Sequence, residues 1–183
     1  MKVGKTFIHI LLSAFLAYQS YRLFEVSLIY TGNYNLLESF FLAVIANLFI
    51  TGTFAFIGFS IPTSKLLPKS FYLVKNKHLL NILYRSLGVK YFRYFLLSTF
   101  WRNKAKQKTF FNGTKSGLEE FIYSSHQAGF GHLGAFIIIL FYSALMLYQD
   151  AYNTFIISTI INIFFNITLS FFKENIESEF RKY

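Results

Sequence analysis

The chain has 183 residues, of which 54% are hydrophobic and only 14% are charged, and its formal net charge is +10. A water-soluble domain of this length carries more surface charge and fewer apolar residues. The composition therefore excludes an ordinary soluble globule and a disordered chain. The absence of cysteine also excludes a disulfide-stabilised module and a thiolate metal site. What remains is a small integral protein of the cell membrane.

The positive charge is concentrated in one central segment. Residues 62–118 contain twelve basic side chains and no acidic one, whereas the rest of the chain carries six basic and eight acidic side chains. We therefore divide the chain into an N-terminal transmembrane hairpin (1–61), a basic cytoplasmic or interfacial segment (62–120), and a C-terminal hairpin with a cytoplasmic tail (121–183).

The first predicted membrane helix covers residues 7–30. It is interrupted near its end by Arg22 and Glu25, which lie three positions apart and can pair on one helical face. An ion pair at the interface and a functional charge inside the membrane both remain open. No cleavage site for a signal peptidase follows the apolar stretch, so we interpret it as an uncleaved anchor.

Three further runs contain no charged side chain, at residues 39–64, 121–149 and 151–172. Each exceeds the ~20 residues that an α-helix needs to cross the hydrocarbon core, and in lipid only a helix satisfies its own backbone. Pro62 is expected to end the first of these helices. Together with residues 7–30 they predict an all-α polytopic membrane protein with four transmembrane helices. Because cations mark the cytoplasmic side, both termini are expected to be cytoplasmic.

The basic segment carries a helical pattern over residues 70–87, and Gly88 fits a helix C-cap with positive φ. A basic helix with apolar residues on one face lies in the lipid headgroup layer. One interpretation is a connector on the membrane surface. The other is a roof over a substrate chamber whose cations attract an anionic ligand. The candidate substrate-binding residues are Lys75, Lys77, Arg85, Lys90 and Arg93. The segment shows no recognised nucleic-acid motif, so we expect no nucleic-acid partner.

Titratable side chains gather where the third membrane helix begins: Glu119, Glu120, His126 and His132. A histidine can act as general base towards a hydroxyl, and a carboxylate can orient the imidazole. If the helix starts near Lys115, the two histidines are about 240° apart around its axis, which argues against a metal clamp. No metal or other cofactor is therefore expected. An interfacial histidine bonded to backbone or water is the alternative for each. Gly129 and Gly131 mark a place where helix backbones can approach closely.

In the last predicted helix, Asn162 and Asn166 lie four positions apart and share a face. Amides inside a membrane need partners, so they face other helices and either hold the bundle together or contact substrate. The chain has no GxSxG elbow, no phosphate-binding loop and no dinucleotide fingerprint. Among acyl chemistries, direct transfer onto an activated hydroxyl is then the simplest one left.

Several short motifs resemble the glycosyl-4,4′-diaponeurosporenoate acyltransferase family, which esterifies the sugar of a carotenoid glycoside with a fatty acyl chain. The resemblance rests on residues 67–71, residues 84–92, Glu119, residues 128–132, and the asparagine-bearing last helix running into residues 173–175. The chain diverges from the family at Gly129, where a glutamate is typical, and in its tail, where arginines are expected.

The resemblance implies a membrane acyltransferase that moves a fatty acyl group, from acyl-CoA, to a hydroxyl of a glycolipid-like or carotenoid glycoside acceptor. His132 is then the expected general base, with Glu119 or Glu120 orienting it in place of the missing glutamate. His126, Asn162 and Asn166 join the five cations as candidate substrate contacts. The alternative function is a non-catalytic membrane subunit or scaffold that binds anionic lipid or a partner protein.

Overall fold

The structure is a computed structural model of the chain. It describes residues 2–29, 34–68, 71, 76–86, 88, 90–91, 94, 98–99 and 115–167. Within these residues every regular element is helical and no strand is present, so the predicted all-α class is confirmed.

The first two long helices form a hairpin. Helix α1 spans Lys2–Ile29 and α2 spans Leu36–Ser60. Asn35 begins α2 with a capping box: its side chain accepts a hydrogen bond from the Glu38 backbone, and the Glu38 carboxylate accepts one from the Asn35 backbone, both at 2.9 Å. The helix ends at Ser60, with Ile61 as its C-cap just before Pro62, as predicted. On α1 the predicted pair forms, with Arg22 Nη1 3.0 Å from Glu25 Oε2 on an exposed face.

The central segment contributes two short helices to the described residues. A 3₁₀ turn, η1, spans Thr63–Lys65, and helix α3 spans Lys77–Ser86. Asn76 caps α3 by accepting a hydrogen bond from the His78 backbone at 3.0 Å. Gly88 has φ +61°, so the predicted left-handed glycine beyond this helix is confirmed. The predicted helix covered residues 70–87; the observed α3 begins at Lys77, and residues 70 and 72–75 lie outside the described residues.

The second hairpin consists of α6, Lys115–Tyr148, and α7, Tyr152–Asn162, which continues into a π-helical turn, η3, at Ile163–Ile167. The turn between them places Asp150 at φ 59°, a conformation that a short polar side chain tolerates. Tyr152 donates a hydrogen bond from its hydroxyl to Asp150 Oδ1 at 2.8 Å. This turn lies between the two apolar runs at 121–149 and 151–172, where the sequence predicted it.

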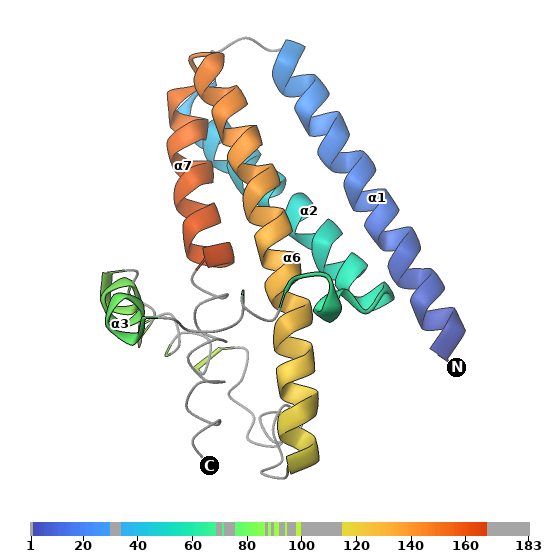
Figure 1. The fold of residues 1–183 in the computed structure, drawn as a ribbon. Coiled ribbons are helices and arrows are strands. Elements are labelled where there is room, and N and C mark those ends of the chain that lie inside the picture. The colour runs from blue at the N-terminus through green and yellow to red at the C-terminus, as the bar shows by residue number, and fades with distance from the viewer. Residues whose placement is uncertain are drawn as a thin grey trace.

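The four long helices alternate in direction (Figure 1). Helix α2 contacts α1, α6 and α7, and so connects the two hairpins. The start of α1, the end of α2, the start of α6 and the end of α7 all lie towards the same end of the bundle, which is also the end where α3 is found. Helix α3 carries Lys77 and Arg85, so part of the basic segment lies at that end.

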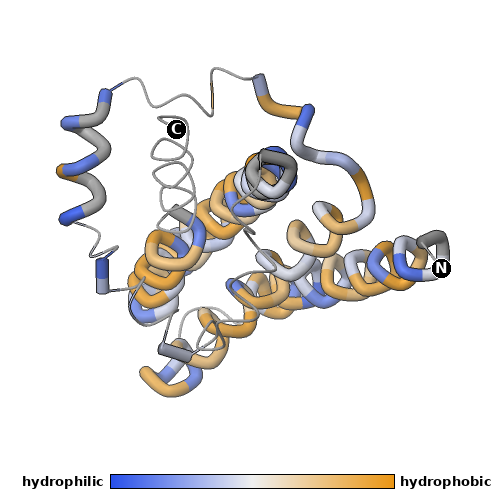
Figure 2. Tube along the Cα trace, turned by 90° about the horizontal axis from the view of Figure 1, so that it is seen from below, coloured by the Kyte–Doolittle hydropathy of each residue, from blue (hydrophilic) through white to orange (hydrophobic). Residues whose placement is uncertain are grey.

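The bundle is polar inside and apolar outside. Among the described residues, thirteen Ser, Thr and Asn side chains are buried, against eight hydrophobic ones. Large apolar side chains face outward instead, including Leu48 at 65% exposure and Phe141 at 70%. Figure 2 shows this apolar character along the long helices, in contrast to the hydrophilic residues of α3. Water would penalise such a surface, whereas a lipid bilayer would not.

Two helices of the described chain are long and apolar enough to cross a membrane: α2, and residues Ile122–Tyr148 within α6. Helix α1 is longer than α2 but carries Lys5, Arg22 and Glu25. In the fourth predicted span, eleven residues of α7 and five of η3 are described. The length and composition of these helices, with the polarity of the bundle, support a membrane protein.

Candidate functional site

Three side chains that the sequence singled out separately form one hydrogen-bonded chain. His132 Nδ1 lies 3.0 Å from Asn166 Oδ1, and Asn166 Nδ2 donates to Asn162 Oδ1 at 2.9 Å. Asn162 Nδ2 in turn donates to the backbone carbonyl oxygen of Phe136 at 3.0 Å. Both asparagines are 1% exposed. We refer to His132, Asn166, Asn162 and the Phe136 carbonyl as the relay.

The relay joins two helices and touches a third. His132 and Phe136 come from α6, while Asn162 ends α7 and Asn166 lies in the π-helical turn η3. Thr51 of α2 approaches from the other side, with its Oγ1 3.5 Å from Asn166 Nδ2. Single π-helical turns are rare in proteins, and those that do occur are frequently found at functional sites. The predicted shared face of the two asparagines is therefore confirmed, and it is turned towards His132.

A row of polar side chains continues from the relay along α7. Thr154, Ser158, Asn162 and Asn166 recur every four residues, and each is 1% exposed or less. Asn47 of α2 reaches this row and donates from Nδ2 to Ser158 Oγ at 2.9 Å. Such hydrogen bonds hold helices together where no water competes. Asn47 is thus a second buried amide side chain in the bundle, and its contact with Ser158 is separate from the relay.

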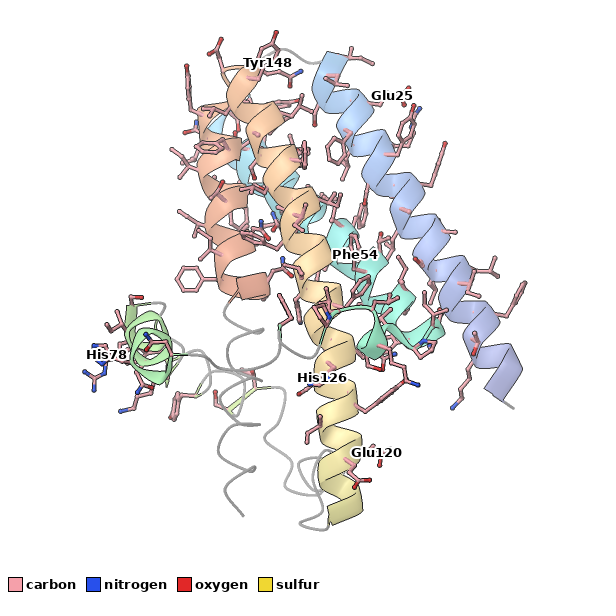
Figure 3. The ribbon with its side chains drawn as sticks, viewed as in Figure 1. Glu25, Phe54, His78, Glu120, His126 and Tyr148 are labelled. Atoms are coloured by element: carbon pink, nitrogen blue, oxygen red, sulfur yellow. The ribbon has the colours of Figure 1, made fainter. Side chains whose placement is uncertain are left out.

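Glycines allow α2 to approach α6 beside His132. A Cβ atom at Gly131 would lie 3.5 Å from the backbone oxygen of Phe54, and one at Gly134 would overlap the Phe54 ring. The ring therefore occupies the space that a side chain at position 134 would need (Figure 3). The predicted close approach of backbones is confirmed at Gly131, and Gly134 adds a second close contact that the sequence did not indicate.

Gln127 of α6 is hydrogen-bonded to the end of α2. Its side-chain amide donates to the carbonyl oxygens of Gly58 and, at 3.3 Å, of Ile61, while Thr63 Oγ1 donates to the Gln127 carbonyl at 3.4 Å. The end of α2 is therefore level with Gln127. His132 lies five residues further into the bundle, about 8 Å along α6. It is a partly buried side chain near the basic end of the molecule.

Glu119 and Glu120 do not reach His132. Both are exposed and precede Gln127 on α6, and Figure 3 shows Glu120 near the start of this helix. At 1.5 Å per residue they lie about 18 to 20 Å from His132 along the axis. The expected orientation of the imidazole by one of these carboxylates thus needs a correction, because Asn166 is the side chain in contact with Nδ1.

The remaining candidates lie apart from the relay. His126 is a partly buried residue of α6, six positions before His132 and between it and Glu120 (Figure 3). Arg85 of α3 and Lys90 are exposed. Lys77 begins α3, and nothing further is described for its side chain. Lys75 and Arg93 lie outside the described residues.

Two participants could not be found from sequence patterns. The Phe136 carbonyl carries no side-chain signal, and Thr51 is one of several hydroxyl residues on α2. The spacing of Asn162 and Asn166 was the signal for the rest of the relay, but it did not say which residue of another helix they meet.

A comparison with family models matches residues 68–173, more than half of the chain, to the glycosyl-4,4′-diaponeurosporenoate acyltransferase family. The chain belongs to this family. The resemblance seen in the sequence is thereby confirmed, and an acyltransferase role in general is supported. The matched region includes α3, α6, α7 and η3, and so contains every side chain of the relay. No curated protein and no solved structure matches the chain.

Proposed function

We propose that the protein is a membrane O-acyltransferase that moves a fatty acyl group from acyl-CoA to a hydroxyl of a glycolipid-like or carotenoid glycoside acceptor, with His132 as general base. Family membership supports the reaction class. The assignment of His132 as the base rests on the relay, in which His132 Nδ1 lies 3.0 Å from Asn166 Oδ1. An imidazole held at one nitrogen can use its other nitrogen in proton transfer.

The proposed reaction is a single displacement. His132 Nε2 takes the proton of the acceptor hydroxyl while the hydroxyl oxygen attacks the acyl carbonyl carbon. The C–O ester bond forms, the C–S bond of the thioester breaks, and the departing CoA thiolate receives the proton from Nε2. No covalent acyl-enzyme and no cofactor takes part in this scheme.

Acyl-CoA would arrive from the basic side of the molecule. The exposed cations Arg85 and Lys90, together with Lys75, Lys77 and Arg93, are proposed to attract its phosphates. His126, between the α6 terminus and His132, is proposed to contact substrate on the way in. The amphipathic 62–120 segment would rest at the cytoplasmic surface of the membrane.

The proposed topology has four membrane-spanning helices, α1, α2, α6 and α7 with its continuation, and both termini in the cytoplasm. It is supported by the alternating helix directions and by the position of the basic helix α3 at the end of the bundle where α2 ends and α6 begins (Figure 1). A reporter domain fused after Trp101 should be accessible only from the cytoplasmic side. Accessibility from outside would refute this orientation.

The function is tested with purified protein in liposomes, labelled acyl-CoA and a glycosylated carotenoid acceptor, with the ester product detected by mass spectrometry. His132→Gln should lower ester formation by roughly 10²-fold or more. The matched control is His9→Gln on α1, which should leave turnover unchanged; the His9 ring makes tilted contacts with Phe56 and Phe59, at centroid distances of 5.8 and 5.5 Å.

Equal activity of His132→Gln and wild type would refute His132 as the base. If wild type forms no ester but purifies with a partner enzyme, the alternative of a non-catalytic subunit replaces the proposal.

A further inference from the structure

We infer that Asn166 and Asn162 are positioning residues that fix the protonation pattern of the His132 ring, so that neutral His132 carries its proton on Nδ1 and keeps the lone pair on Nε2. Neither asparagine needs to touch substrate for this role. The inference deepens the proposed function and rests on it for its catalytic consequence. The predicted protonation pattern of the His132 ring depends only on the geometry of the relay.

The direction of the relay is set at its far end. The Phe136 carbonyl can only accept a hydrogen bond, so the Asn162 atom 3.0 Å from it must be the amide nitrogen. This leaves Asn162 Oδ1 facing Asn166. Because a carboxamide oxygen only accepts, the Asn166 atom 2.9 Å away must again be an amide nitrogen. Asn166 Oδ1 is then the atom that faces the imidazole, and no reversal of either amide is compatible with the carbonyl.

The consequence for His132 follows from the same rule. Asn166 Oδ1 has no proton to donate, so the ring atom 3.0 Å from it must be protonated. A neutral imidazole carries one proton, and with that proton on Nδ1 the other nitrogen is the basic one. Fixing a histidine in this way through a partner on the opposite nitrogen is a general device of acid–base catalysis.

Burial makes the arrangement stable. Both asparagines are 1% exposed, so water cannot compete for their donors and acceptors. Reversing one amide would place two acceptors, or two donors, against each other in a site of low dielectric constant. The Asn166 amide nitrogen also donates to Thr51 Oγ1 at 3.5 Å, so it has acceptors on both α7 and α2. The asparagine that replaces the expected carboxylate thus acts as an acceptor without adding charge inside the membrane.

The ring nitrogens are read directly by solid-state NMR on protein labelled with ¹⁵N-histidine in lipid bilayers, at a pH about two units above the ordinary histidine pKa of about 6.5. The chain has four histidines, and His132→Gln identifies the signals of His132. Wild type should show protonated Nδ1 and unprotonated Nε2. Asn166→Asp retains an acceptor and should keep this pattern. Asn166→Leu removes the acceptor and should shift the proton to Nε2 or to a mixture.

Asn162→Leu tests the relay itself. Without Asn162 Oδ1, the Asn166 amide is free to reverse and point an N–H at the ring, which favours protonation of Nε2. The matched control is Asn47→Leu, which removes another buried amide of the bundle, 5% exposed, whose partner is Ser158. It should leave the His132 signals unchanged. Ester formation should fall by roughly 10²-fold or more in Asn166→Leu and stay within a few-fold of wild type in Asn166→Asp.

Protonation of Nε2 in wild type, or an unchanged pattern in both Asn166→Leu and Asn162→Leu, would overturn the inference. The NMR measurement needs no substrate, so its result is independent of the proposed reaction. The predicted tautomer without any acyl transfer refutes the proposed function alone. Acyl transfer that depends on His132 but not on Asn166 refutes the positioning role alone.

Discussion

Substitution of Gly134 by alanine should separate α6 from α2 beside the candidate base. A Cβ atom there would lie 2.5 Å from Cδ1 and 3.0 Å from Cζ of Phe54, and closer still to Cε1. Carbon atoms pack best at about 3.5 to 4.0 Å, so the ring has to retreat by about 1 Å or more. Overpacking of this kind costs about 1 to 3 kcal/mol of folding free energy.

Gly131→Ala is the matched control because it lies one turn away on the same helix. Its Cβ atom would meet the Phe54 backbone oxygen at 3.5 Å, which is an ordinary contact. Both substitutions gain the same helix propensity, about 1 kcal/mol, so this contribution cancels in the comparison. Gly134→Ala should therefore be less stable than Gly131→Ala by about 1 to 3 kcal/mol.

The difference is measured by unfolding the two proteins in mixed micelles of dodecyl maltoside and SDS, followed by far-ultraviolet circular dichroism. Phe54→Leu shortens the opposing side chain and should restore stability to Gly134→Ala. Equal unfolding free energies for the two alanine variants, or a double variant no more stable than Gly134→Ala, would refute the packing argument.

Three further predictions concern contacts outside the relay. Gln127→Ala removes the amide that links α6 to the end of α2 and should cost about 1 to 2 kcal/mol in the same unfolding measurement. Tyr142→Phe loses only a 3.4 Å contact to Ser27 and should cost less than about 1 kcal/mol. Tyr142→Ala should cost about 3 to 5 kcal/mol because the ring is fully buried.

Each of these predictions would be contradicted by a specific result. A Gln127→Ala protein as stable as wild type would show that the end of α2 is held by other contacts. Similar losses for the two Tyr142 variants would assign the stability to the hydroxyl instead of to the ring.

The helical elements were largely readable from the sequence. Charge-free runs longer than a membrane crossing predicted α2, α6 and α7, and Pro62 and Gly88 marked helix ends through local backbone geometry. These signals depend on neighbours within a few residues, which is why no tertiary information was needed. The pattern over residues 70–87 did not reveal that Asn76 caps a separate helix, because apolar-basic periodicity alone does not define where a short helix begins.

The site was readable only in part. His132, Asn162 and Asn166 stood out because polar side chains in an apolar run must find partners. Their sequence positions suggested that a glutamate of the same helix would orient the histidine. In the structure the partner comes from 34 residues further along the chain.

The sequence by itself determined the composition of a membrane protein, its helices, their polar residues and the position of the basic segment. Tertiary structure alone decided which polar groups meet. A rigid helix keeps Glu119 and Glu120 about 18 to 20 Å from His132, whereas the antiparallel return of α7 brings the end of that helix level with it. The Phe136 carbonyl, which no side-chain pattern can reveal, then gives the relay its direction.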